Sequence, residues 1–233
     1  MAGIDALMRE MLFDETWSPG FRFSYLKGLF DAEYYRRSYP DVPESVSPLL
    51  HFVVTGGFEG RNPHPLFDTA FYAARYPEAA ASPYNPLLHY LKYGCSRSLQ
   101  PHPLFDPEYY LRSNPDLRAA RVNPLLHYVL HGAAEGRKPH PLFQPDYYLR
   151  NCPDAKSSRH SPLAHFLLCR GDWADPHPLF HCEDYLTAHP DAAASGMNPL
   201  VHYVLFGSHT HLWKEGVQFG QHARPTGQAP CGQ

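Results

Sequence analysis

An internal repeat constrains the fold of this chain more than any other feature of its sequence. A Leu-Phe pair recurs at intervals of 37, 38, 38 and 37 residues, and a Pro-Leu-x-His motif follows each pair. The phenylalanines of these pairs are Phe30, Phe67, Phe105, Phe143 and Phe180. Self-similarity at a period of this length is typical of proteins built from stacked supersecondary units. We therefore expect five copies of one unit over residues 29–216.

The first half of each copy predicts a short helix. In the third copy, Asp106 is suited to the N-cap and Pro107 to the first helical position. Phe105 and Tyr110 have the spacing of a hydrophobic staple, which fixes how the chain enters a helix. Because Pro115 disfavours helical geometry in the residue before it, the helix is expected to end there.

The second half of each copy predicts another helix, followed by an extended connector. In the third copy, Asn123 is the expected N-cap, Pro124 the first helical residue, and Gly132 or Gly136 the terminator. A Pro-His-Pro segment then leads to the next copy, and its prolines fix φ and have no N–H to donate. The 25 prolines are thus interpreted as helix starts, stops and connectors rather than as a sign of disorder.

These units predict an all-α protein, an α-solenoid of five helical-hairpin repeats. One hairpin cannot bury its apolar face, whereas stacked hairpins can. We expect residues 1–28 to form an N-terminal cap helix and a degenerate half-repeat, residues 29–216 the solenoid, and residues 217–233 a disordered tail. The cap helix, residues 4–12, is predicted from apolar residues at helical spacing: Ile4, Leu7, Met8, Met11 and Leu12.

Composition narrows the class of protein. The net charge of −3 and the pI near 6.6 do not favour nucleic acid or an anionic membrane surface as a partner. No apolar run approaches the ~20 residues that span a bilayer, and the first residues lack the apolar core of a secretory signal. The five cysteines are scattered, which predicts free thiols in a reducing compartment and hence a cytoplasmic location.

The third copy, LFDPEYYLRSNPDLRAARVNPLLHYVLHGAAEGRKPHP, resembles a helical repeat that accompanies bacterial glycosyltransferases and other surface-polysaccharide-synthesis proteins. The shared elements are FDxxYYL, NPD, NPLLHY and GxxEGRxPHP. The second copy departs from this pattern with RSL in place of EGR, and the fourth is one residue short. Because the chain has no Asp-x-Asp motif of the kind that many glycosyltransferases use, the resemblance implies association with glycan assembly rather than the transfer reaction.

One histidine per copy is expected about one turn inside the second helix: His51, His89, His127, His165 and His202. The helix dipole disfavours a positive charge there, so we expect neutral imidazoles. The structural hypothesis is a ladder of partly buried, hydrogen-bonded rings that link adjacent copies, and the alternative is a ligand groove lined by them. His127 and His131 are four residues apart, as are His165 and Cys169, so these four form a candidate zinc site.

A second set of histidines lies in the connectors: His64, His102, His140 and His177. A residue between two prolines has few conformations, so its ring is held in one direction. The structural hypothesis is a hydrogen bond to the free carbonyls at the end of the preceding helix. The functional alternative is a row of surface imidazoles that contact a glycan or a protein partner.

A charged column also recurs, with Arg37, Arg112 and Arg150 at one position and an acidic residue four positions later. This spacing predicts exposed ion pairs, and arginines without a partner would be available to acidic sugars. The Tyr-Tyr pairs that precede these arginines predict one core ring and one more exposed ring each.

The expected function is a non-catalytic binding or scaffold module. It would recruit a protein partner, such as a glycosyltransferase, in surface-polysaccharide assembly. We assign no catalytic residue and no cofactor, because the sequence has none of the short motifs that mark common active sites. Two alternatives remain, a module that binds glycan directly and a repeat region derived from a glycosyltransferase.

Overall fold

The computed structural model describes residues 23–207, except residues 121 and 170. Within these residues the chain is helical, and its only β-type pairing consists of isolated bridges in the connectors. Contacts divide the chain into two units that meet between Leu130 and His131, inside the third copy of the repeat. The predicted helix at residues 4–12 and the tail at 217–233 lie outside the described residues, and a single solenoid over 29–216 stays a prediction.

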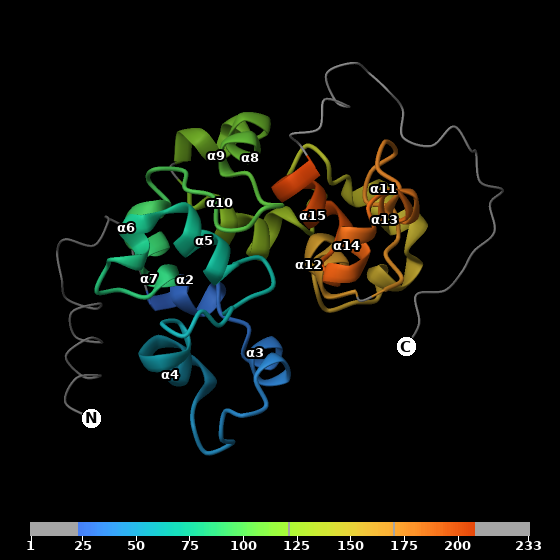
Figure 1. Ribbon diagram of the computed structural model, residues 1–233. Helices are drawn as coiled ribbons and strands as arrows, with labels where there is room; N and C mark the ends of the chain where they lie inside the picture. Colours follow the sequence, from blue (N-terminus) through green and yellow to red (C-terminus); the bar gives the residue numbers. More distant parts are fainter. Residues whose placement is uncertain (1–22, 121, 170, 208–233) are drawn as a thin grey trace. The chain divides into compact units, whose positions relative to one another are not determined.

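The first unit contains one helix before the repeats, the first two copies and the third copy as far as Leu130 (Figure 1). Its helical segments are α2 (Phe23–Gly28), α3 (Ala32–Ser38), α4 (Pro48–His51), η1 (Phe52–Gly56), α5 (Thr69–Arg75), α6 (Pro77–Ala80), α7 (Pro86–His89), η2 (Tyr90–Gly94), α8 (Pro107–Ser113), α9 (Pro115–Ala120) and α10 (Pro124–His127), with η3 (Tyr128–Gly132) at the boundary.

The second unit contains the last two copies, which appear from yellow to red in Figure 1. Its helical segments are α11 (Pro145–Asn151), η4 (Pro153–Lys156), α12 (Pro162–Leu168), α13 (Cys182–Ala188), α14 (Pro190–Ser195) and α15 (Pro199–Phe206). No helix in the part of the chain that the structure describes has the length and apolar character needed to cross a bilayer.

The predicted helix starts are confirmed in the third copy. The Asp106 carboxylate accepts a hydrogen bond from the Tyr109 amide at 2.9 Å, and Pro107 begins α8. The rings of Phe105 and Tyr110 lie 5.6 Å apart, as the hydrophobic staple requires. Asn123 caps α10 in the same way, through the Leu126 amide at 3.0 Å.

The expectation of two helices per copy is wrong for copies two to five. The first helix ends before the proline of the NPD-type motif, as expected, but that proline begins a further short helix. This third segment is α6, α9 or α14 in three copies and the 3-10 helix η4 in the fourth. Proline suits the first position of a helix because its fixed φ is helical. An N–H at that position would have no carbonyl partner within the helix, so its absence costs no hydrogen bond.

The second helix of the first three copies changes from α to π geometry after its histidine. The Gly57 amide donates to the Phe52 carbonyl at 2.8 Å, and the Cys95 amide donates to the Tyr90 carbonyl at 2.9 Å. A π turn accommodates one extra residue. In the fourth copy, which is one residue shorter, α12 stays α-helical and Cys169 is extended. In the fifth copy α15 is likewise α-helical through Phe206.

The core is built from the repeated aromatic positions. Phe67, Phe105, Phe143 and Phe180 are buried, as predicted. Phe30 is a correction, because it is only half-buried while Leu29 beside it is fully buried. In each Tyr-Tyr pair the second ring is buried and the first is half-buried, which confirms the prediction for these pairs.

Candidate functional site

Every helix histidine is hydrogen-bonded to the buried tyrosine of its own copy. This contact joins the first helix of a copy to its second helix, so the prediction that these histidines link adjacent copies is wrong. The distances from the hydroxyl oxygen to Nδ1 are 2.9 Å for Tyr35–His51, 3.0 Å for Tyr72–His89, 2.9 Å for Tyr110–His127, 2.8 Å for Tyr148–His165 and 2.9 Å for Tyr185–His202.

Burial favours the neutral imidazole in two of these pairs, those of His89 and His165. Loss of solvation lowers the pKa of His89 and of His165, because the charged imidazolium is disfavoured in a partly buried site. The same effect raises the pKa of Tyr35 and of Tyr185 to about 12. A neutral phenol and a neutral imidazole stabilise the fold, but neither is tuned toward proton transfer at neutral pH.

We expect the protein to lose stability as the pH falls below about 6.5. His89, His165 and His177 have pKa values lowered by burial, so the unfolded chain binds more protons below its ordinary pKa of 6.5. The stabilisation is complete above that value and is lost as the pH falls toward the folded-state pKa values. Urea denaturation at a series of pH values measures this slope.

The variants His89→Gln and His165→Gln serve as controls for this slope, since each removes one titrating group. Each variant should flatten the dependence of stability on pH. An NMR titration of the wild type should give pKa values below the ordinary value for the His89 and His165 rings. Unfolding midpoints that do not change across this pH range would contradict the assignment.

The connector histidines form tight local turns, and their predicted bond to the preceding helix stays a prediction. In His64 the carbonyl accepts from the Phe67 amide at 3.0 Å, while Nδ1 accepts from the Leu66 amide at 3.1 Å. The same Nδ1 contact recurs at His102, His140 and His177. The proton of each neutral ring is therefore on Nε2, and protonation of Nδ1 would break the bond.

In the first, second and fourth copies the connector also closes the copy onto its own start. The Asp31 amide donates to the Pro63 carbonyl at 2.9 Å, and the Asp68 amide donates to the Pro101 carbonyl at 3.0 Å. The Gln144 amide does the same with Pro176 in the second unit, at 2.9 Å. With one side engaged in the turn, these imidazoles are half-buried or, at His102, buried. They do not form a fully exposed row.

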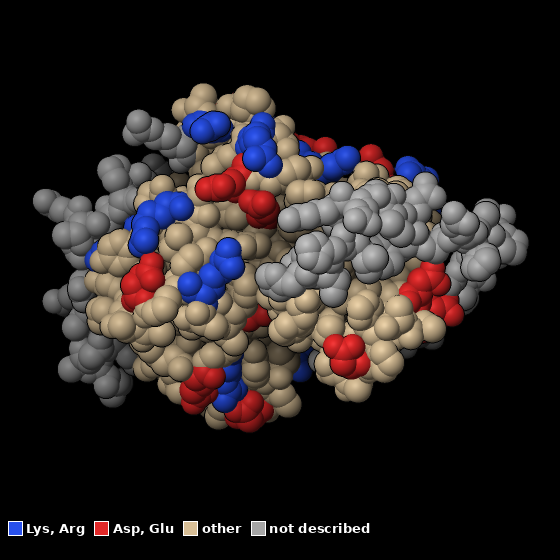
Figure 2. Space-filling model, turned by 45° about the horizontal axis from the view of Figure 1, so that its top comes forward, with Lys and Arg blue, Asp and Glu red and all other residues tan. Residues whose placement is uncertain are grey.

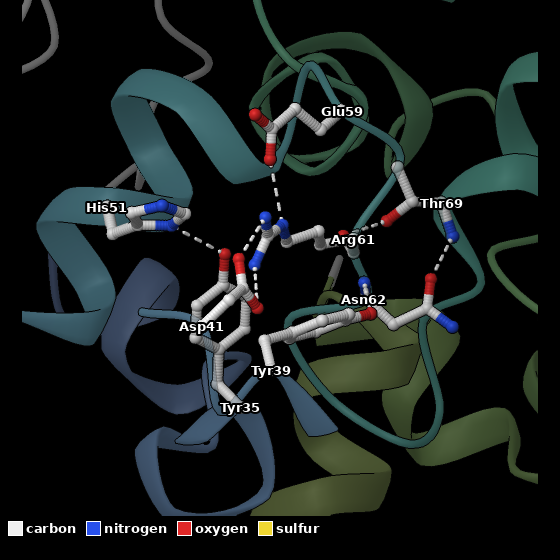
Figure 3. A network of polar contacts seen from close by, with 8 residues as sticks. All are labelled: Tyr35, Tyr39, Asp41, His51, Glu59, Arg61, Asn62 and Thr69. Carbon is white, nitrogen blue, oxygen red and sulfur yellow. Dashed lines mark hydrogen bonds and ion pairs between the residues drawn. The ribbon is translucent and has the colours of Figure 1, made fainter. Parts of the chain in front are cut away.

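In the first copy the connector is held by a polar network around Arg61 (Figure 3). The Arg61 guanidinium donates to both carboxylate oxygens of Asp41, at 3.0 and 2.7 Å, and to Glu59 at 2.8 Å. Its central carbon lies 5.0 Å from the centre of the Tyr39 ring. The bond from Arg61 lowers the pKa of Asp41. The backbone N–H of Asn62 donates to the Tyr39 hydroxyl at 2.7 Å, so the network connects the connector to the end of α3.

This network shows that the predicted pairing of Arg37 with Asp41 is wrong. Arg37 pairs with Glu33, one turn earlier in α3, at 2.9 Å. Asp41 lies beyond the end of α3, where the i, i+4 geometry of a helix no longer applies, and there it meets Arg61 instead.

Arg112 and Arg150 each lie beside an aromatic ring of the same helix. The Arg112 guanidinium carbon lies 6.0 Å from the centre of the Tyr109 ring, and Arg150 lies 5.8 Å from Tyr147. Arg75 and Phe71 repeat the arrangement at 5.9 Å in the second copy. We call these three pairs the aromatic–arginine shelves. Each presents an exposed arginine and a half-buried ring.

The candidate zinc ligands are brought together only in part. Cys169 Sγ lies 3.6 Å from His165 Nδ1, and both contact the Tyr148 hydroxyl. Burial raises the pKa of the Cys169 thiol, which disfavours the thiolate that a metal or a substrate needs. Among the residues that the structure describes, no group of three or more His, Cys, Asp and Glu side chains could hold a metal ion. Zinc binding by His127, His131, His165 and Cys169 stays a prediction.

Two features of the structure were missed in the sequence. The first is the Tyr–His pairing, for which a signal existed: the two residues are 17 apart in four copies and 16 apart in the first. The second is Lys92, which is 7% exposed at a position that is apolar in the neighbouring copies. Its Nζ donates to the Tyr84 hydroxyl at 2.8 Å and lies 4.4 Å from the centre of that ring.

Comparison with protein-family models, with curated proteins and with solved structures finds no match for this chain. The function is therefore argued from the residues and contacts described above.

Proposed function

We propose that this chain is a non-catalytic binding or scaffold module, an α-solenoid of five helical repeats that recruits a protein partner in bacterial surface-polysaccharide assembly. The polysaccharide context comes from the resemblance of the repeat. Binding rather than catalysis is supported by the roles that the repeated side chains have in the structure.

The observation that carries the proposal is the contrast between the histidines and the arginines of the repeat. The helix histidines bond to buried tyrosines, and the connector histidines bond to backbone amides. The shelf arginines Arg75, Arg112 and Arg150 are exposed beside aromatic rings. Arginine and aromatic side chains are the residues most enriched in protein interfaces. Repetition of such a shelf favours recognition of an extended partner.

The distribution of charge agrees with a mixed interface. Figure 2 shows Lys and Arg interspersed with Asp and Glu on the face drawn, with uncharged surface between them. A partner at such a face would be recognised by local stacking and short-range pairing rather than by a field of one sign.

A second candidate function is direct binding of an acidic glycan, and the same shelves favour it. A guanidinium can bind a sugar carboxylate through two parallel hydrogen bonds. The adjacent ring offers an apolar surface on which a sugar can stack.

A pull-down with the purified full-length chain, with bound proteins identified by mass spectrometry, tests the proposal. We expect a partner from polysaccharide assembly, and we expect the triple variant Arg75→Ala, Arg112→Ala, Arg150→Ala to weaken its binding by about tenfold or more. The matched control is Arg118→Ala, Lys138→Ala, Lys156→Ala, which removes three exposed charges outside the shelves and should keep binding.

The other outcomes separate the candidates. Retention of an acidic polysaccharide in a glycan array, without a protein partner, favours the second function. Turnover of a sugar nucleotide by the purified chain contradicts the non-catalytic assignment. Equal binding by the shelf variant and the wild type contradicts the role of the shelves.

A further inference from the structure

Two cysteines of the fourth copy lie beside its Tyr–His pair. Cys152 follows α11, and its amide donates to the Tyr148 carbonyl at 2.8 Å. Cys169 follows α12, and its amide donates to the His165 carbonyl at 3.0 Å. Each cysteine is therefore one helical turn beyond a member of the hydrogen-bonded pair. Because α11 and α12 contact each other, the two thiols belong to neighbouring helices.

Both thiols interact with the same phenol. Cys169 Sγ lies 3.9 Å from the Tyr148 hydroxyl oxygen, and the Cys152 side chain forms a hydrogen bond with that hydroxyl. Two sulfur atoms that contact one oxygen are separated by no more than the sum of the two contacts. A disulfide requires an S–S distance of about 2.0 Å, so each sulfur has to turn away from the phenol toward the other.

The fourth copy is the one that has thiols at both of these positions. In the second copy the two positions hold rings, and the rings lie 4.9 Å from the Tyr72 ring and 5.2 Å from the His89 ring. The residues at the two positions in the other copies are Tyr39 and Thr55, Tyr76 and Tyr93, Asn114 and His131, and His189 and Phe206. Small side chains that can bond to each other thus replace both neighbours of one Tyr–His pair.

The backbone at Cys169 leaves its side chain free to turn. α12 ends at Leu168, and Cys169 is extended, with φ −62° and ψ 140°. The corresponding residues of the first three copies lie inside π-helical segments. Cys169 is half-buried, whereas Cys152 has no solvent exposure. An oxidant from solution therefore reaches Cys169 more readily than Cys152.

We propose that Cys152 and Cys169 form a reversible intramolecular disulfide when the protein meets hydrogen peroxide. The Cys169 sulfur attacks one peroxide oxygen, the O–O bond breaks, and the products are a sulfenic acid and water. The Cys152 sulfur then attacks the sulfenic sulfur, and a second water leaves as the S–S bond forms. The two thiols are oxidised by the loss of two hydrogen atoms, and one peroxide is reduced to two waters.

His165 is placed to accept the proton of the attacking thiol. Its Nδ1 lies 3.6 Å from Cys169 Sγ, and burial lowers the pKa of this histidine, so the neutral ring has a free lone pair at neutral pH. Burial also raises the pKa of the Cys169 thiol, which keeps the thiolate scarce in the absence of an oxidant. The pair is therefore suited to a transient disulfide of the kind found in redox-sensing proteins rather than to a permanent cross-link.

The disulfide would restrict the second unit. It would connect the ends of α11 and α12 and close the segment between them, which includes η4. The Tyr148 hydroxyl would lose two sulfur neighbours and keep its bond to His165 Nδ1 at 2.8 Å. This inference does not depend on the proposed scaffold function, because it concerns only the chemistry of the fourth copy.

Peptide mapping of the full-length chain tests the proposal. The protein is treated with hydrogen peroxide, its remaining thiols are blocked with N-ethylmaleimide, and it is digested with trypsin without a reductant. Cleavage at the lysine and arginines of this region places the two cysteines in separate peptides, residues 151–156 and 160–170. We expect these peptides to be joined, with a mass two hydrogen atoms below their sum, and to be separated by dithiothreitol.

Two variants sharpen the test. Cys152→Ser leaves the oxidised Cys169 without a partner, so its sulfenic acid should persist and react with dimedone in the peptide of residues 160–170. The matched control is Cys95→Ser, which removes a half-buried thiol of the first unit and should form the disulfide to the same extent as the wild type.

Three results would overturn the proposal. The first is recovery of both peptides blocked and unlinked after treatment with peroxide. The second is a disulfide that joins either cysteine to Cys95, Cys182 or Cys231, or to a second chain. The third is a disulfide that forms only after the helical circular dichroism of the chain is lost, because the bond would then belong to the unfolded state.

Discussion

Phe105→Ala is expected to lower the free energy of unfolding by about 3–5 kcal/mol. The Phe105 side chain has no solvent exposure, and its ring packs 5.6 Å from the rings of both Tyr110 and Tyr128. Truncation removes the burial of a large apolar group and leaves a cavity that two rigid aromatic neighbours cannot fill. Urea denaturation followed by circular dichroism measures the loss.

The matched control for this substitution is Phe206→Ala. Phe206 is 57% exposed, so its truncation should cost less than about 1 kcal/mol. If Phe105→Ala leaves the denaturation midpoint unchanged, the repeated Leu-Phe pair is not the core anchor that its burial indicates.

Gly94→Ala is expected to lower the free energy of unfolding by about 2–4 kcal/mol. The added Cβ would lie 2.5 Å from the Tyr72 hydroxyl oxygen and 2.8 Å from Tyr90 Cδ2. Both tyrosines are fully buried, and the Tyr72 hydroxyl is bonded to His89 Nδ1 at 3.0 Å. The substitution must therefore displace a packed ring and weaken a buried hydrogen bond.

A double-mutant cycle with Tyr72→Phe isolates the steric part of this effect. Tyr72→Phe removes the hydroxyl and should itself cost about 1–3 kcal/mol, because it takes away the partner of His89 Nδ1. The double variant should lose less stability than the sum of the two single variants.

Gly60→Ala is the control for the cycle. A Cβ at Gly60 meets nothing within 4 Å, so its cost arises only from the φ of +81° and should not depend on Tyr72. If the losses in unfolding free energy of Gly94→Ala and Tyr72→Phe simply add in the double variant, the Tyr72 hydroxyl is not what excludes a side chain at Gly94.

Much of the local structure could be predicted because its signals lie within a few residues of one another. The caps at Asp106 and Asn123 and the staple between Phe105 and Tyr110 each depend on residues no more than five apart. The start of a short helix at Pro115 could also have been inferred from the preference of proline for the first helical position.

Side-chain contacts were predicted less well, because several partners were possible for the same side chain. Arg37 and Asp41 have helical spacing, but α3 ends at Ser38 and Asp41 pairs with Arg61, twenty residues away. The local contact of the connector histidines was not predicted either. Their rings accept from an amide two residues later, because the Pro-His-Pro-Leu-Phe turn brings that amide into reach.

The amino-acid order was sufficient to determine the period of the repeat, the helix starts and the aromatic positions of the core, because caps, prolines and apolar spacing act over one or two turns. Tertiary packing decided that each helix histidine bonds to the tyrosine of its own copy, that the second helix of the first three copies takes a π turn, and that Leu50 is exposed while Leu88 is buried. These outcomes depend on contacts between segments many residues apart and on how closely side chains pack against glycines. The spacing of residues within one or two turns does not determine either of these.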